Sequence, residues 1–224
     1  MSTPPPTPKD FPAEKAWEPL PWRFWDEATA AHFLRRLGFA ATPEGIKRAL
    51  RGTTEEAIDA AFREAKPLPK SEDLGAFEGE LHEAYQSIRQ DLTDREAKRE
   101  KRQKLRRQDN DLFREFAMSW FAHARQPENS AREKFVLFLQ DVFVVERQVV
   151  RATPLLFNLQ KTLRESLRMR YPDLCKWVSR EPAMVRYLNL NQSTKTAPNE
   201  NFARELFELF TLGEGNYSER DIKE

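Results

Sequence analysis

Apolar residues recur at helical spacing along most of the chain, whereas the strict alternation typical of β-strands is almost absent. The clearest example is the stretch 198–213, whose apolar residues share one broad arc of a helical wheel: Phe202, Ala203, Leu206, Phe207, Leu209 and Phe210. Asn199 or Asn201 can cap the start of this helix, and Gly213 follows it where a left-handed C-cap is favoured. The pattern predicts an all-α protein, a multi-helix bundle with one helix over 200–212.

Start and stop signals divide the rest of the chain into regions. Asp26, Thr42 and Thr53 each stand where a side chain can cap the first turn of a short helix. Prolines dominate the N-terminus, and they return before the long segment that follows residue 72. We expect a disordered proline-rich lead over 1–17, a small N-terminal helical subdomain over 18–65, a linker over 66–72, a long charged helical arm over 73–125 and a helical core over 126–224.

The arm is distinguished by its middle, residues 95–107, which holds eight basic and two acidic residues and almost no apolar ones. A helix that is polar all round projects into solvent or bridges two packed ends. The sequence therefore predicts one long helix or a helical hairpin, partly projecting into solvent. A nucleic-acid footprint would also be basic, but aromatic residues for base stacking are missing here. We expect no tight binding of nucleic acid and keep it as an alternative function.

The predicted core contains the most apolar segment of the chain and the richest polar one. Residues 131–147 predict a central core helix, opened by a capping box that starts at Ser130. Residues 189–197 form a loop of amide and hydroxyl side chains that leads into the helix at 200–212, and a helix N-terminus attracts anions. This is the predicted binding site or polar network: Asn189, Asn191, Asn199, Glu200, Asn201, Arg204, Glu205 and Glu208.

The composition of the chain argues against several classes of function. The chain has 37 basic and 36 acidic residues, a net charge of +1, so its overall charge attracts neither nucleic acid nor an anionic membrane. No apolar run approaches the roughly 20 residues of a membrane span. The single cysteine, Cys175, excludes an internal disulfide and a cysteine-based zinc cluster. We expect no metal and no cofactor, and no catalytic residue can be named.

Three segments resemble a bacterial family of unknown function, DUF-1800. They are PNENFARELFELFTLGEGNY at 198–217, EPAMVRYLNLNQSTKTA before it and, more loosely, HFLRRLGFAATPEGI near the N-terminus. The resemblance implies no established activity. Relatives commonly show a Trp-His-Asn-His-Phe-like run where this chain has Leu139-Gln140-Asp141-Val142-Phe143, without either histidine. Any metal or acid–base step that used those histidines would be missing here.

The resemblance also suggests a partner and a missing part. Relatives are often encoded beside a phosphatase-like family, which implies a protein partner. In the family the helix that begins at Ser218 continues into a large C-terminal part, so we expect this chain to be an N-terminal portion. An apolar surface would then be uncovered near Phe207, Phe210 and Tyr217.

The N-terminus has no basic and apolar regions of a secretory signal, so we expect a cytoplasmic protein, or an exported one if the true start differs. We expect a binding or interaction domain without demonstrable catalysis. The first alternative is an enzyme or degenerate enzyme that uses the cluster at 199–208. No motif indicates its reaction class, and hydrolysis is the reaction to test first. The second is nucleic-acid binding through 95–107. Sequence does not define the oligomeric state.

Overall fold

The computed structural model describes residues 14, 18, 24–90 and 94–223. The predicted proline-rich lead over 1–17 lies outside the described residues apart from Glu14. Helices dominate the described part, where the β-type pairing found is one isolated bridge between Thr194 and Ala197. The all-α prediction is confirmed. The chain divides into two compact units: unit 1 is Met1–Lys66 with Ala124–Lys134, and unit 2 is Pro67–His123 with Phe135–Glu224.

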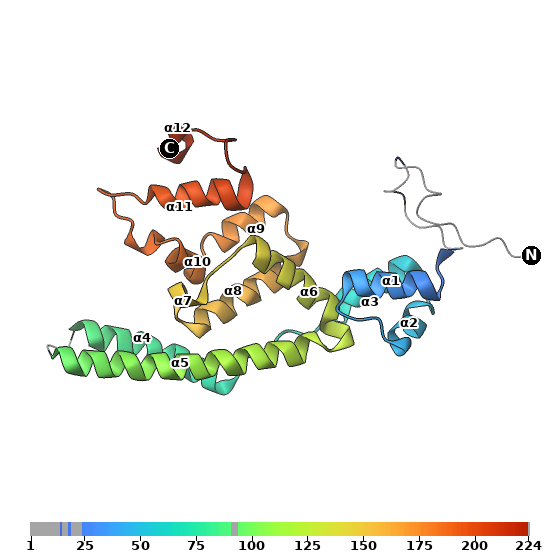
Figure 1. Ribbon diagram of the computed structural model, residues 1–224, viewed down its shortest axis with the longest axis horizontal. Coiled ribbons are helices and arrows are strands. Elements are labelled where there is room, and N and C mark those ends of the chain that lie inside the picture. Colours follow the sequence, from blue (N-terminus) through green and yellow to red (C-terminus); the bar gives the residue numbers. More distant parts are fainter. Residues whose placement is uncertain (1–13, 15–17, 19–23, 91–93, 224) are drawn as a thin grey trace, which may run out of the picture. The chain divides into compact units, whose positions relative to one another are not determined.

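Unit 1 is built from short helices whose start signals work as the sequence predicts. Its elements are α1 (Glu27–Leu37), α2 (Pro43–Ala49), α3 (Thr54–Arg63) and the first half of α6 (Pro127–Val142) (Figure 1). The side chain of Asp26 accepts the N–H of Thr29, and that of Thr42 accepts the N–H of Gly45. Thr53 forms a complete capping box with Glu56. These bonds satisfy backbone donors that a helix start leaves unpaired.

The first half of α6 joins unit 1 through its side chains. Ser130 Oγ accepts the N–H of Phe39 at 2.8 Å, and Lys134 Nζ donates to the carbonyls of Arg35 and Gly38, both at 2.7 Å. A Cβ at Gly38 would lie 2.6 Å from Ser130 Oγ, so only glycine permits this approach. The predicted capping box at Ser130 is wrong, because α6 begins before it and its hydroxyl binds the α1–α2 loop instead.

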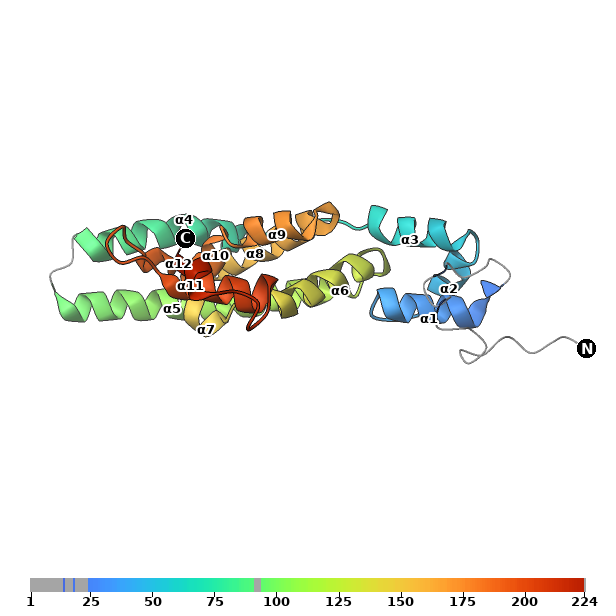
Figure 2. The same cartoon turned by 90° about the horizontal axis from the view of Figure 1, so that it is seen from above.

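Unit 2 contains the charged arm as a helical hairpin. The arm consists of α4 (Glu72–Gln90) and α5 (Arg95–Ala124), which lie side by side in both views (Figures 1 and 2). Lys101 Nζ donates to Ser87 Oγ at 2.5 Å, and Gln108 Nε2 donates to Glu80 Oε2 at 3.3 Å. These two bonds fix an antiparallel register. The basic stretch 95–107 is helical and belongs to α5.

The rest of unit 2 packs around α8 (Thr153–Glu165). Its other elements are the second half of α6, α7 (Arg147–Val150), α9 (Tyr171–Val178), α10 (Pro182–Tyr187), α11 (Glu200–Glu205), a π-helical segment η6 (Leu206–Thr211) and α12 (Glu219–Lys223). Phe157 of α8 packs into a small apolar cluster with Leu74 and Phe116 of the arm. Leu159 and Leu163 of α8 belong to the larger cluster. Helix α8 therefore links the arm to the core.

The prediction of a central core helix over 131–147 is wrong. Helix α6 ends at Val142 and buries one face only, with Val136 and Leu139 inside the larger cluster. Leu137 and Phe138 are 44% and 59% exposed. The centre belongs to α8 because α4, α7, α9 and α10 all pack against it. Among the described helices, none has the length and apolar character needed to cross a lipid bilayer.

The two faces of α6 provide a first test. We expect Leu139→Ala to lower the free energy of unfolding by about 2–5 kcal/mol, because it opens a cavity in a buried cluster. Leu137→Ala, two residues away on the exposed side, is the matched control and should cost less than about 1 kcal/mol. Urea unfolding followed by circular dichroism measures both. Equal losses would contradict the one-sided packing of α6.

Candidate functional site

The predicted polar site is anchored by Asn199, which caps α11. Its Oδ1 accepts the N–H of Phe202 at 3.3 Å, and its Nδ2 donates to the carbonyl of Leu188 at 2.9 Å. Its own N–H donates to Ser193 Oγ at 3.1 Å. The half-buried amide thus ties the loop after α10 to the start of α11. All three of these groups satisfy protein atoms, so Asn199 supports the local fold.

Arg204 and Glu208 meet two residues that the sequence did not place in the site. Arg204 makes two hydrogen bonds to the Glu219 carboxylate, at 2.8 and 3.2 Å, and Tyr217 donates its hydroxyl to Glu208. The hydrogen bond to Glu208 raises the pKa of Tyr217, and the bonds to Glu219 raise the pKa of Arg204 further above its usual value. The segment that contains Tyr217 and Glu219 therefore covers this face of α11 and η6.

Glycines provided the signal that sequence reasoning could have used for Tyr217 and Glu219. Gly213 and Gly215 have φ angles of +80° and +79°, a backbone conformation that favours glycine. These two glycines, separated by Glu214, reverse the chain after η6 and return it along α11, where Phe207 stacks on Tyr217 at 5.6 Å between ring centroids. The reversal brings α12 against α11.

The remaining predicted site residues are more dispersed. Asn189, Asn191, Glu200 and Asn201 are exposed, and Glu205 is half-buried. Asn189 has a left-handed backbone and accepts a hydrogen bond from Gln192. Within the described residues, no hydrogen bond joins these five to Arg204 or Glu208. The same part of the chain contains no group of three or more His, Cys, Asp or Glu side chains arranged to hold a metal ion.

The π-helical segment η6 receives two donors from α9. Tyr171 donates its hydroxyl to the carbonyl of Phe210 at 2.5 Å, and the Cys175 thiol approaches the same oxygen at 3.8 Å. Burial raises the pKa of the Cys175 thiol, and also that of Tyr171. A π-helix shifts its backbone bonds by one residue, and these donors satisfy a carbonyl at its end. Cys175 is 6% exposed and packs in the core.

An uncovered apolar surface was expected near Phe207, Phe210 and Tyr217, and these three residues are not themselves exposed. Phe210 is 4% exposed and packs on Phe143 at 5.4 Å between ring centroids. Phe207 is covered by Tyr217. The exposed apolar residues of η6 and its end are Leu209 and Leu212, at 57% and 48%. The reversal at the two glycines covers one side of the segment and leaves the other open.

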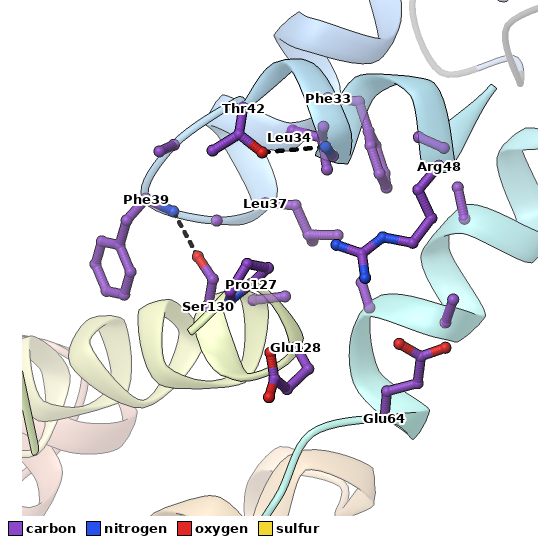
Figure 3. A pocket seen from close by; sticks show the side chains of 18 of the residues that line it. Phe33, Leu34, Leu37, Phe39, Thr42, Arg48, Glu64, Pro127, Glu128 and Ser130 are labelled. Carbon is purple, nitrogen blue, oxygen red and sulfur yellow. Dashed lines mark hydrogen bonds between the residues drawn. The ribbon is translucent and has the colours of Figure 1, made fainter. Parts of the chain in front are cut away.

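A pocket that the sequence did not predict lies within unit 1. Its volume is about 450 Å³, and α1, α2, α3 and the start of α6 surround it (Figure 3). Phe33, Leu34 and Leu37 of α1 form one wall. The facing wall, on α3, consists of small residues: Ala57, Ala60 and Ala61. Methyl groups are too short to reach α1, so the space between these helices stays open.

Charged side chains surround this apolar interior. Figure 3 shows Arg48 extending from α2 toward Leu37, with Glu64 at the end of α3. Glu56 accepts the N–H of Thr53, and Glu128 pairs with Lys66 at 3.7 Å. Neither of these glutamates is therefore free.

The unpaired charges of the pocket are mainly positive. Arg48, Arg51 and Arg125 line it, and no hydrogen bond or ion pair with another described residue occupies their guanidinium groups. Glu64 is the lining carboxylate left without such a partner in the described part of the chain. The pocket thus combines an apolar interior with an excess of unpaired guanidinium groups.

The chain matches a model of one protein family over most of its length. The family is described as "Protein of unknown function (DUF1800)", and the match covers residues 32–224. The match includes every residue that lines the unit 1 pocket and the polar network of α11 and α12. No curated protein and no solved structure matches the chain significantly. The chain therefore belongs to the DUF1800 family.

Proposed function

We propose that this protein is a helical binding domain and that the unit 1 pocket holds a small molecule with an apolar body and an acidic end. The observation that supports the proposal is the pocket itself, which has a volume of about 450 Å³ and is bordered by α1, α2, α3 and α6. Pockets for small ligands measure roughly 300–1,000 Å³ and combine apolar walls with a few polar groups. The unit 1 pocket has both properties.

The apolar walls of the pocket favour a ligand with an apolar body. Phe33, Leu34 and Leu37 face the alanines of α3, so an occupant gains by burying apolar surface on both sides. The α1–α2 loop is held against α6 by Ser130 and Lys134, which makes one side of the pocket rigid before any ligand enters. A preformed site loses less conformational entropy on binding than one that must be ordered.

The guanidinium groups of the pocket favour a ligand with an acidic end. Arg48 reaches over the apolar interior and finds no acidic partner among the described residues (Figure 3). A carboxylate offers two oxygens that a guanidinium binds in parallel, and such charge-assisted bonds are stronger than neutral ones. Glu64, at the end of α3, repels an anion, so the acidic end should lie on the α2 side, at Arg48.

Binding of decanoate, a straight-chain carboxylate, tests this function. Decanoate should bind saturably in isothermal titration calorimetry, and decanol, which lacks the charge, should bind less tightly. Arg48→Gln should weaken decanoate binding about tenfold, because one charge-assisted contact is lost. Lys47→Gln removes the same charge from the next residue of α2, which does not line the pocket, and should leave the affinity unchanged.

Filling the cavity gives an independent check. Ala60→Leu places a larger side chain in the apolar interior and should abolish decanoate binding while preserving the thermal unfolding transition. Ala28→Leu on the exposed side of α1 makes the same change outside the pocket and should bind normally. If Ala60→Leu binds as tightly as the parent chain, the ligand is not in this pocket.

A second candidate function is docking of a protein partner, and an exposed aromatic pair on α6 supports it. Phe135 and Phe138 are 37% and 59% exposed and lie 6.1 Å apart between ring centroids. Aromatic side chains are enriched at protein interfaces, where their burial contributes much of the binding energy. The partner we propose for this pair is the phosphatase-like protein encoded beside relatives.

We expect Phe138→Ser to weaken association with that purified phosphatase-like protein by about tenfold or more, as for a residue at the centre of an interface. Leu137→Ser is the control, because Leu137 is 44% exposed on another side of the same helix. Biolayer interferometry measures both affinities. Equal weakening by the two variants, or no association of the parent chain, would remove the aromatic pair from consideration.

The enzyme alternative is less well supported by the geometry of α11. Arg204 is held by Glu219, and Glu208 accepts from Tyr217. A substrate or ion at this cluster would have to replace those protein partners. The unit 1 pocket has space and unpaired charge without any such displacement, which is why we favour binding there.

A further inference from the structure

A second cavity, within unit 2, gathers four arginines from three parts of the chain. It has a volume of about 200 Å³ and lies between the arm and the core of that unit. Arg102 and Arg106 reach it from α5, Arg151 from the turn between α7 and α8, and Arg186 from α10. Asp109 is the one acidic residue among those that line it. Side chains of like charge do not converge in this way without an energetic cost.

Asp109 does not neutralise Arg102, Arg106 or Arg151, because its carboxylate serves other groups. Its Oδ1 accepts the N–H of Thr153 at 2.6 Å, and its Oδ2 lies 3.4 Å from Arg147 Nη2. Arg147 is not one of the lining residues. The single negative charge of the cavity is therefore already balanced from outside it.

Arg102 and Arg106 increase the excess of positive charge in the cavity. They are four residues apart on α5 and so lie on one face of the helix, a spacing at which like charges repel. Neither has a hydrogen bond or ion pair with another residue in the described parts of the chain. An arginine pair on a helix usually gains from acidic neighbours at this spacing, and here Asp109 is the nearest one.

Arg151 is aimed at the cavity by an unusual backbone. Its φ angle is +48°, in the left-handed region that glycine favours, at the C-terminal end of α7. Its Nε donates to the carbonyl of Gln148 at 2.5 Å, and no other bond to a described residue occupies the guanidinium. Its two terminal nitrogens thus remain for a ligand. Non-glycine residues in this conformation are concentrated at functional sites.

We infer that this cavity, which we call the arginine pocket (Arg102, Arg106, Arg151 and Arg186), binds the phosphoryl group of a small soluble molecule. Guanidinium groups match phosphate oxygens with paired hydrogen bonds, and a phosphoryl group has three such oxygens. A cavity of about 200 Å³ admits one phosphorylated group and not a nucleic-acid duplex. The inference concerns unit 2 and is independent of the ligand proposed for unit 1.

Pyrophosphate is the probe for the arginine pocket. Calorimetric titration at constant ionic strength should show saturable binding, with sodium chloride at the same ionic strength as the blank. The double variant Arg102→Gln/Arg106→Gln should weaken it about tenfold or more, because two guanidinium contacts are lost. The matched control is Arg99→Gln/Arg107→Gln, which removes two exposed charges from the same helix outside the cavity and should change the affinity by less than about twofold.

Arg151→Gly separates loss of the site from loss of the fold. Glycine accepts the left-handed backbone at this position without strain, so the variant should unfold at the parent temperature or above while binding pyrophosphate more weakly. Three outcomes would overturn the inference. They are the absence of saturable pyrophosphate binding, equal weakening by the pocket and control variants, and a duplex oligonucleotide that binds more tightly than pyrophosphate and loses affinity equally in both double variants.

Discussion

Unit 2 depends on the hydrogen bonds between Asp109 of α5 and Thr153 of α8. Helix α8 begins at Thr153 behind Ala152, whose side chain makes no capping bond. The missing acceptor comes from another helix: Asp109 of α5 accepts the Thr153 N–H at 2.6 Å, and the Thr153 hydroxyl donates to the carbonyl of Asp109 at 3.1 Å. Both residues are buried. A buried N–H without a partner costs about 1–3 kcal/mol, so α8 is stable in this place only when α5 is beside it.

Several features of unit 2 follow from that bond. It brings the apolar end of α5 against α8, where Phe116 packs edge-to-face on Phe157 at 5.7 Å between ring centroids. It also draws Arg147 to the arm, where the guanidinium lies 4.2 Å from the Phe113 ring centroid. Because Asp109 is satisfied by Thr153 and Arg147, it does not balance Arg102 and Arg106, which precede it on α5. The same bond that holds the core to the arm leaves the arginine pocket positively charged.

Unit 1 follows a different principle, in which small residues leave space. Alanines on α3 face the larger side chains of α1, and the helices are held apart by their loops and by α6 rather than by close contact. No residue of α3 is buried. A core filled to native density would place larger side chains there. The alanines of α3 therefore leave the space between the helices unfilled. For this reason we propose the pocket as the binding site of this family member.

Local signals in the sequence were sufficient for the helices and for most of their starts. Asp26, Thr42, Thr53 and Asn199 each cap the helix that their positions predicted, because a cap depends only on residues within one turn. The all-α class and the helical character of 95–107 followed from composition and periodicity for the same reason. Periodicity failed at α6, since it shows that a face is apolar but not whether another helix covers it.

The candidate sites needed the tertiary structure. Arg204 and Glu208 were recognised as polar neighbours, but their partners Glu219 and Tyr217 come from a stretch that two glycines fold back. The arginine pocket joins α5 to residues about 50 and 80 positions later in the chain, and such a juxtaposition leaves no periodic trace. A cavity is likewise a property of the distance between helices. Sequence patterns report which face of a helix is apolar, whereas long-range packing alone determines which faces meet and where they leave space.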